Sequence, residues 1–183
     1  CLSDTGNKEV DKTNRRYLET VIRHHVSGRF KVAPEHCSPT VLGLMRKPAF
    51  GLFQQLKSIF DEINRKHRLN EQIIPYFISS HPGCRPEDMA KLAVATKTLD
   101  FKLEQVQDFT PTPMTVATTI YYSGYHPYSL QKIDTAKSEK EKKQQNMFFF
   151  WYKREFREQI MTLLRRIHRA DLIPKLYGKE REK

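Results

Sequence analysis

Two Pro-rich segments decide the fold of this chain: QIIPYFISSHPGCRPEDM at 72–89 and LEQVQDFTPTPMTVATTIYYSG at 103–124. Each segment runs from an apolar, strand-like stretch into a turn rich in Pro, Gly and small polar residues. Polar groups that directly follow strand ends commonly bind ligands, because such loops are held in place by a rigid scaffold. The two segments therefore predict a ligand-binding edge on an α/β domain.

The spacing of apolar residues extends this α/β alternation on both sides of the two segments. Strands are predicted at 29–34, 73–79 and 103–108. Helices are predicted at 11–26, after Ser38-Pro39, around the apolar stripe from Leu52 to Ile63, after Pro86, and at 153–169. Helical crossovers of this length imply parallel strands joined by right-handed connections. Residues 73–79 are almost wholly apolar, as in a strand buried on both faces, although Pro75 cannot donate a hydrogen bond there.

The last third of the chain departs from this pattern. Residues 110–136, with several Pro and Tyr, predict an irregular connection that crosses the core domain. KSEKEKKQQ at 137–145 indicates either a solvated linker or the exposed start of a helix. FFFWY at 148–152 is too apolar for water and is expected to dock the C-terminal extension. GKEREK at 178–183 is expected to fray.

Composition limits the class of protein. The 183 residues suffice for one domain with an appendage, and 38% hydrophobic residues indicate a folded protein. Cys1, Cys37 and Cys84 are too dispersed for a disulfide framework, which favours a reducing cytoplasm. The sequence has no membrane helix or signal peptide. It does not begin with Met, so we expect a piece of something longer.

The net charge of +11 is concentrated towards the C-terminus, where residues 137–183 hold 14 Lys and Arg against 7 Asp and Glu. Such an excess is found in proteins that contact nucleic acid or another anionic partner. It is also found in amphipathic helices and charged tails that are merely solvated. No known nucleic-acid motif interleaves aromatic and basic residues here, so the solvated alternative is favoured.

Several residues at the predicted strand ends carry candidate chemistry. His81, Pro82 and Gly83 precede a helix whose first N–H groups would suit an anion, unless HPG only makes the turn and Ser80 or Cys84 caps the helix. Glu35 could hold an amine or be an ordinary surface residue. Gln105 and Gln107 share a strand face and could read a nucleobase or an amino-acid group, or form a polar network.

Other chemistries lack their motifs. His36-Cys37 and His81 with Cys84 match no usual metal-ligand spacing, so a zinc site is not expected. GxSxG, GxxxxGK[ST] and GxGxxG are absent from the sequence, which argues against the common hydrolase, NTPase and dinucleotide-binding folds.

Six sequence blocks in order resemble the C-terminal half of the YgiQ-type radical S-adenosylmethionine (SAM) proteins: HHVSGRFKVAPEH (24–36), LMRKP (44–48), IPYFISSHPG (74–83), LEQVQDFTPTPMTVAT (103–118), IYYSGYHPY (120–128) and FFFWYK (148–153). The resemblance implies an α/β fold with about three parallel strands, namely strands four to six of a partial (β/α)6 barrel. It assigns residues 1–124 to this half-barrel and residues 125–183 to a C-terminal helical extension. The usual Pro after WYK is missing, a minor departure at a helix start.

The resemblance also implies cofactors. Radical SAM enzymes hold a 4Fe–4S cluster through CxxxCxxC and use it to cleave SAM to methionine and a hydrogen-abstracting 5′-deoxyadenosyl radical. The three cysteines here lie 36 and 47 residues apart, so the cluster loop is expected upstream. The parent protein would be the enzyme, and this chain alone would be inactive.

By position, the resemblance places SAM against the ends of all three strands. Pro34 and Glu35 would approach its polar end. The segment Ile78, Ser79, Ser80 with the turn residues His81, Pro82 and Gly83 would flank ribose and adenine. Gln107 and Phe109 would close over the nucleoside.

Two functional hypotheses follow: a SAM-facing part of a radical SAM enzyme with unknown substrate, or a basic module that contacts RNA or another anion. A half-barrel would also expose one edge of the strand RFKVAP (29–34). We expect N-terminal residues to cover that edge or the chain to self-associate through it.

Overall fold

The computed structural model describes residues 6–103 and 106–178, which form an α/β structure in two compact units. The first unit comprises residues 1–34 and 48–76, and the second comprises residues 35–47 and 77–183. Cys1, Glu104, Gln105 and the tail from 179 lie outside the described residues, so the expectations attached to them stay predictions. The division at residue 124 also stays a prediction.

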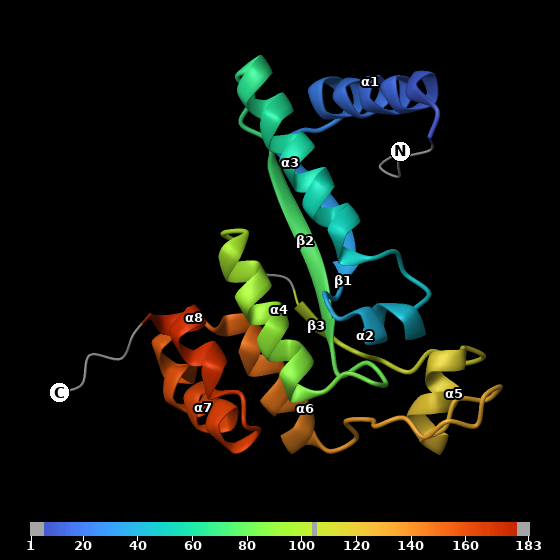
Figure 1. Ribbon diagram of the computed structural model, residues 1–183, viewed down its shortest axis with the longest axis vertical. Helices are drawn as coiled ribbons and strands as arrows, with labels where there is room; N and C mark the ends of the chain where they lie inside the picture. The colour runs from blue at the N-terminus through green and yellow to red at the C-terminus, as the bar shows by residue number, and fades with distance from the viewer. Residues whose placement is uncertain (1–5, 104–105, 179–183) are drawn as a thin grey trace. The chain divides into compact units, whose positions relative to one another are not determined.

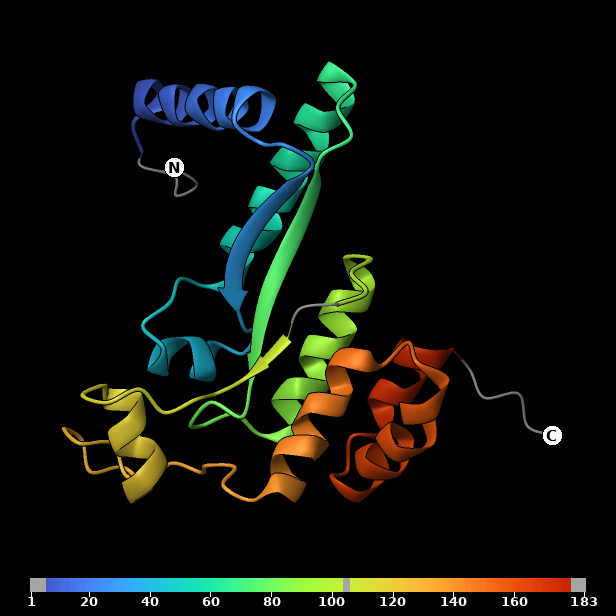
Figure 2. The ribbon, with the colours of Figure 1, turned by 180° about the vertical axis from the view of Figure 1, so that it is seen from behind.

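The three predicted strands are present and form one sheet in the order β1-β2-β3. They are β1 (Arg29–Glu35), β2 (Gln72–Ser79) and β3 (Val106–Asp108). In the second unit β2 pairs with β3 in parallel, with Phe77 opposite Val106 and Ser79 opposite Asp108. In the first unit the β1 and β2 arrows point the same way (Figure 2). The described strands form an open parallel sheet.

Burial along β2 corrects the prediction of a strand buried on both faces. Ile73, Pro75, Phe77 and Ser79 are buried, whereas the alternate residues are half-buried. The cause is one-sided cover within each unit: α3 lies against one face of the first unit's part of β2, and α4 lies against one face of the second unit's part (Figures 1 and 2). Pro75 precedes the described β2–β3 pairing, so its missing N–H costs that ladder nothing.

The first unit packs two helices with the paired parts of β1 and β2. They are α1 (Lys8–His24) and α3 (Phe50–His67). Leu18 and Ile22 of α1 are buried, and the α1 residue Glu19 pairs with Lys66 and His67 of α3. Phe30 of β1 stacks on Phe60 of α3 with ring centroids 5.8 Å apart. The amphipathic stripe predicted for α3 therefore faces its core.

The second unit is mainly helical. Its remaining elements are α2 (Pro39–Leu44), α4 (Pro86–Thr98), α5 (Val116–Ser123), α6 (Glu139–Asn146), η1 (Met147–Phe150), α7 (Arg154–Arg166), η2 (Ala170–Leu172) and α8 (Ile173–Tyr177). The predicted apolar sides of α4 and α7 are buried, including Met89, Leu92, Ile160 and Leu164. The four α7 arginines, Arg154, Arg157, Arg165 and Arg166, stay exposed, as expected for an amphipathic helix.

FFFWY docks as predicted, because Phe148 and Phe149 of η1 are buried against α4, α6 and α7. Residues 137–145 prove to be the start of a helix, α6, capped by a reciprocal pair between Ser138 and Glu141. The irregular connection predicted for 110–136 is partly wrong. It contains α5, which Thr115 begins as N-cap and Gly124 ends at φ 78°.

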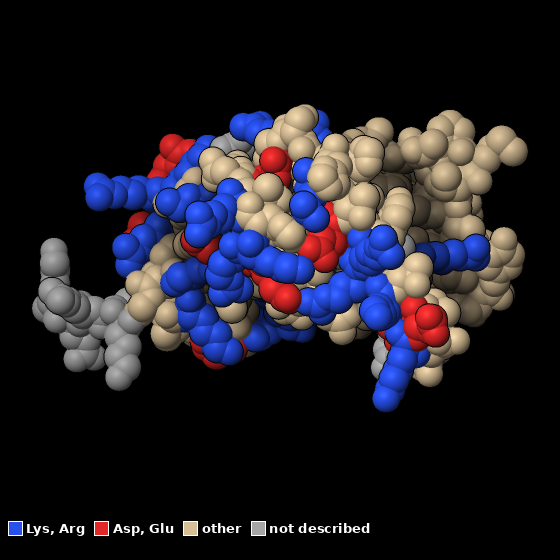
Figure 3. All heavy atoms as spheres, turned by 90° about the horizontal axis from the view of Figure 1, so that it is seen from above, with Lys and Arg blue, Asp and Glu red and all other residues tan. Residues whose placement is uncertain are grey.

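Charged side chains of both signs are interspersed on the face shown in Figure 3, where Lys and Arg outnumber Asp and Glu. A nucleic-acid partner and self-association through β1 both stay predictions. Across residues 6–103 and 106–178, every helix is too short or too polar to cross a membrane.

Candidate functional site

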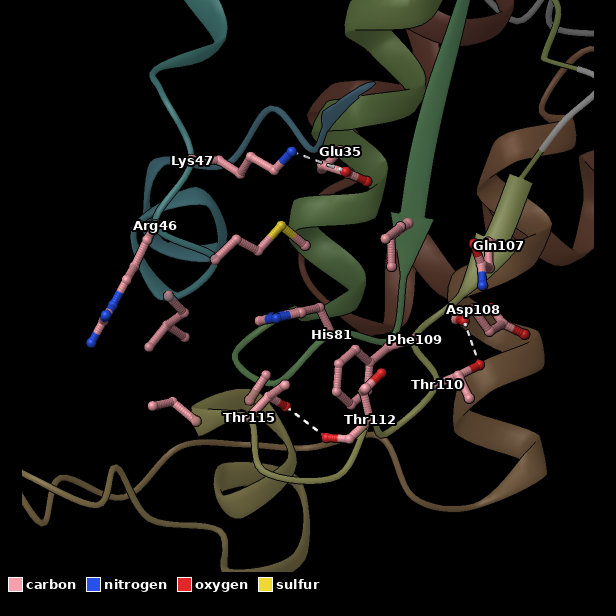
Figure 4. Close-up of a pocket in the computed structure, with 15 residues that line it drawn as sticks. Glu35, Arg46, Lys47, His81, Gln107, Asp108, Phe109, Thr110, Thr112 and Thr115 are labelled. Carbon is pink, nitrogen blue, oxygen red and sulfur yellow. Dashed lines mark hydrogen bonds and ion pairs between the residues drawn. The ribbon is translucent and has the colours of Figure 1, made fainter. Parts of the chain in front are cut away.

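A cavity of about 510 Å³ in the second unit is bordered by the ends of all three strands (Figure 4). Glu35 comes from the end of β1, Ile78 and His81 from the end of β2, and Gln107 and Phe109 from the end of β3. The remaining lining residues come from the loop after α2 and from the segment that leads into α5: Leu44, Met45, Arg46, Lys47, Asp108, Thr110, Thr112, Thr115, Val116 and Ala117. The carboxyl ends of parallel strands thus converge on one hollow.

Of the ten residues predicted to contact a cofactor, the structure brings five together around this cavity: Glu35, Ile78, His81, Gln107 and Phe109. Pro34, Ser79, Ser80, Pro82 and Gly83 are not among its lining residues. Pro34 belongs to the first unit, and the buried Ser79 and Ser80 support the wall from behind. Gly83 instead borders a second cavity of about 560 Å³ beside α2 and α4.

One end of the cavity carries an ion pair. Lys47 Nζ lies 3.2 Å from Glu35 Oε1, and the Glu35 side chain is only 16% exposed. Glu35 has φ 65°, a left-handed conformation that is costly for a residue with a side chain. Ser80, after β2, has φ 61°. Such strained residues persist where the surrounding structure holds them, often at binding sites.

The middle of the cavity is aromatic. The His81 ring meets the Phe109 ring edge to face, with centroids 5.0 Å apart. Burial lowers the pKa of His81 below its usual value of 6.5, so the ring is neutral near pH 7. His81 Nδ1 lies 2.9 Å from the Pro82 carbonyl oxygen. In the neutral ring Nδ1 therefore carries the proton and donates it, which leaves Nε2 as an acceptor.

Three N–H groups in and beside the HPG turn are bonded within the protein. Ser80 N–H donates to Gln145 Oε1, Gly83 N–H to the Asp134 carbonyl and Cys84 N–H to the His81 carbonyl. The expectation that Ser80 or Cys84 caps the helix is wrong, because the N-cap of α4 is Arg85, whose N–H donates to Asp88 at 3.2 Å. The turn shapes the wall of the cavity with these three donors bonded, and an anion at the first N–H groups of α4 stays a prediction.

Sequence reasoning missed two residues behind the wall, Gln145 and Asn146 at the end of α6. Gln145 is buried and bonds both ends of the turn that carries His81. Asn146 Nδ2 donates to Asp108 Oδ1 at 3.1 Å, and Ser79 Oγ donates to the same oxygen. One sequence signal could have indicated them. The charged run that ends at Lys143 is followed by uncharged Gln and Asn residues just before the apolar run that begins at Met147.

Gly83 is required by backbone geometry. It has φ 81°, and a Cβ built there would lie 2.5 Å from Leu44 Cδ1. We expect Gly83→Ala to lower the free energy of unfolding by about 1–2 kcal/mol, because alanine disfavours this conformation and Leu44 must move. Chemical denaturation measures the change. Gly43→Ala is the matched control, because Gly43 lies in α2 with open space around it. This variant should keep the free energy of unfolding of the wild type. A Gly83→Ala protein as stable as the control would contradict this account.

A metal site is not found among the described residues, whose His, Cys, Asp and Glu side chains form no group of three or more suited to a metal ion. His36 Nδ1 instead accepts the Ser38 N–H, and His36 Nε2 lies 3.5 Å from Cys84 Sγ. Burial lowers the pKa of His36 to about 4 and raises the pKa of Cys37 to about 12. Burial likewise raises the pKa of Cys84. The thiols are therefore protonated near pH 7, and thiolates are the form that binds metal.

Comparison with known proteins gives a consistent group of relatives. The chain is 59% identical to a UPF0313 protein of Bacteroides thetaiotaomicron over 178 residues, which is 97% of this chain and 29% of that protein. It is 59% identical to a UPF0313 protein of Porphyromonas gingivalis over 97% of this chain and 28% of that protein. A UPF0313 protein of Methanocella arvoryzae is 39% identical over 87% of this chain and 27% of its own length.

The chain thus spans less than a third of the length of these relatives. Residues 104–180 match DUF3362, a domain of unknown function. UPF0313 is the YgiQ-type family that the sequence resembles.

Proposed function

From its homology to a segment of the YgiQ-type UPF0313 proteins, we propose that this chain forms one wall of a SAM pocket in a radical-SAM-type iron–sulfur enzyme. The observation that carries the proposal is the convergence of Glu35, His81 and Phe109, from three different strand ends, on one cavity. Parallel strands of one sheet bring their carboxyl ends to the same edge, and a hollow there that is lined by polar and aromatic side chains is a common place for a small ligand.

The cavity suits SAM in size and chemistry. Its volume of about 510 Å³ lies within the roughly 300–1,000 Å³ typical of small-molecule sites. SAM carries an ammonium and a carboxylate at one end and adenine at the other. The Glu35–Lys47 pair can exchange its internal contact for two external ones, Glu35 with the ammonium and Lys47 with the carboxylate.

Other residues would bind the nucleoside end of SAM. Phe109 and Ile78 offer an aromatic ring and an aliphatic side chain for the adenine faces, and Gln107 offers an amide for the adenine edge. Bound SAM would supply the 5′-deoxyadenosyl group for hydrogen abstraction. The residues of this chain bind and orient it.

The 4Fe–4S cluster does not fit the described residues. Fe–S clusters need closely placed thiolates, whereas Cys37 is half-buried, Cys84 is buried, and the pKa of each thiol is raised. We assign the cluster to a part of the enzyme other than this chain.

We infer that the substrate is uncharged where it meets residues 109–131. From Phe109 to Gln131 the sequence contains no Asp, Glu, Lys or Arg, although 29% of the whole chain is charged. Thr110, Thr112 and Thr115 of this segment border the cavity, and Tyr122 and Tyr128 beyond it are exposed. A charged substrate group would have no opposite charge to meet on this side.

The test is a titration of this chain with SAM and with adenosine, followed by calorimetry or by NMR. Glu35→Gln should weaken SAM binding at least tenfold, because the ammonium loses its counter-charge, and should leave adenosine binding unchanged because adenosine has no ammonium. Asp61→Asn is the matched control, since Asp61 also pairs with a lysine, Lys57, but lies on α3 in the first unit. Equal SAM affinity of Glu35→Gln and wild type would remove Glu35 from the site. Absence of SAM binding by wild type would defeat the proposal for this chain.

A further inference from the structure

The buried amide of Gln145 connects the C-terminal extension to the wall of the cavity. Gln145 lies in α6 and is only 3% exposed. Its Oε1 accepts the Ser80 N–H at 2.8 Å, and its Nε2 donates to the Cys84 carbonyl at 2.8 Å. One side chain therefore bonds the first and the last residue of the turn Ser80–Cys84.

This turn needs support from outside. Ser80 has φ 61° and Gly83 has φ 81°, so two of its five residues are left-handed. Within the turn, Cys84 N–H donates to the His81 carbonyl and the His81 ring bonds the Pro82 carbonyl. Gly83 N–H donates outside the turn, to the Asp134 carbonyl in the loop before α6. The Gln145 amide bonds the two ends of the turn, the Ser80 N–H and the Cys84 carbonyl. Strained backbone persists where surrounding contacts over-determine it, and these contacts supply that condition.

Asn146 performs a parallel function at the next strand end. Its Nδ2 donates to Asp108 Oδ1 at 3.1 Å, and Asp108 also accepts the Ser79 hydroxyl. Asp108 lies between Gln107 and Phe109, which border the cavity. Two consecutive residues of α6 thus hold the ends of β2 and β3 in one relative arrangement.

The helix that carries these two side chains is itself anchored. Ser138 and Glu141 cap its start reciprocally, and the buried Phe148 and Phe149 follow its end. Movement of the Gln145 amide would require displacing that apolar core. Hydrogen bonds buried in such a position are expensive to break, because each freed N–H or carbonyl stays away from water.

We propose that Gln145 and Asn146 are positioning residues that keep His81 and Phe109 in the geometry that receives the ligand. The segment that matches DUF3362 then has a physical function: residues 107–117 supply one side of the cavity, and α6 braces the opposite turn from behind. The consequence for ligand binding rests on the proposed SAM pocket, whereas the bracing of the turn does not.

Gln145→Met tests the brace, because methionine keeps nearly the same length and volume and removes both hydrogen bonds. Gln144→Met is the matched control on the same helix, where the lost contact is an exposed one to Arg166. Amide hydrogen exchange by NMR reports Ser80 individually, and the same samples are titrated with SAM.

In Gln145→Met the Ser80 amide should exchange at least tenfold faster, amides of α4 and α7 should keep their rates, and SAM affinity should fall at least tenfold. Gln144→Met should change none of these. Gln145→Glu should restore slow Ser80 exchange in part, since its carboxylate still accepts that N–H but cannot donate to Cys84. If Gln145→Met fails to fold, Asn146→Ala tests whether α6 holds the cavity wall, because it removes the hydrogen bond from Asn146 to Asp108 at the end of β3.

An unchanged Ser80 rate, or an equal rise in α4 and α7, would overturn the brace. Selective loosening of Ser80 with unchanged SAM affinity would overturn the positioning function. If wild type binds no SAM, the proposed pocket fails, and the exchange rates still decide whether Gln145 holds the turn.

Discussion

Replacing Phe148 with alanine is expected to lower the free energy of unfolding by about 3–5 kcal/mol. Phe148 is completely buried in η1, which packs against α4, α6 and α7. Removing its ring leaves a cavity where the helices of the second unit meet, and a close-packed core relaxes only partly into such a space. Urea denaturation followed by circular dichroism measures the change.

Tyr128→Ala is the matched control for this prediction. Tyr128 is also an aromatic residue of the second unit, but it is 75% exposed, so its removal should change stability by no more than about 0.5 kcal/mol. A loss below about 1 kcal/mol for Phe148→Ala would show that η1 is not part of the core. The apolar run FFFWY would then need another explanation.

Acid should destabilise the protein through His36. Its pKa is about 4 in the folded chain because burial disfavours the charged ring, against an ordinary value of 6.5. Below pH 6.5 the unfolded chain binds a proton that the folded chain does not bind. The free energy of unfolding is therefore lost as pH falls from about 6.5 to about 4, by about 3 kcal/mol from this group, and levels off below pH 4.

His36→Gln should remove most of this dependence while lowering stability at pH 7, because the imidazole bond to Ser38 N–H is lost. His24→Gln, an exposed position near the end of α1, serves as the control and should keep the wild-type pH profile. Denaturation midpoints between pH 4 and pH 7 supply the measurement. A wild-type profile in His36→Gln would contradict the assignment to His36.

Much of the fold could be predicted because local rules and tertiary packing agree. The apolar stripe of α3 is wide enough to determine which side of the helix is buried. In α7 the arginines likewise lie apart from the buried Ile160 and Leu164. Glu35 and His81 could be picked out because apolar strands stop abruptly at polar turns, whereas Phe109 was indicated only by the family resemblance. In α5 the run VATTIYYS is short, β-branched and uncharged, so its helix depends on the caps at Thr115 and Gly124.

The HPG turn shows where prediction from sequence fails. The N–H groups of Ser80, Gly83 and Cys84 donate to acceptors on Gln145, Asp134 and His81, and the sequence did not indicate the first two of these partners. Gln145 lies 65 residues from Ser80, and nothing in the local pattern relates the two. A glutamine beside a charged run resembles a solvated residue until the chain folds it into the core.

The sequence by itself determined the order of the three strands and of the helices up to α4, the apolar faces of α3, α4 and α7, and the strand ends at which a ligand would bind. These features depend on residue periodicity and on turn chemistry, which act over a few residues. Only the tertiary structure decided that the three strand ends share one cavity and that the turn's donors are used internally. It also decided that α6 braces the wall, because hydrogen bonds between distant segments are chosen by packing and leave no local periodicity.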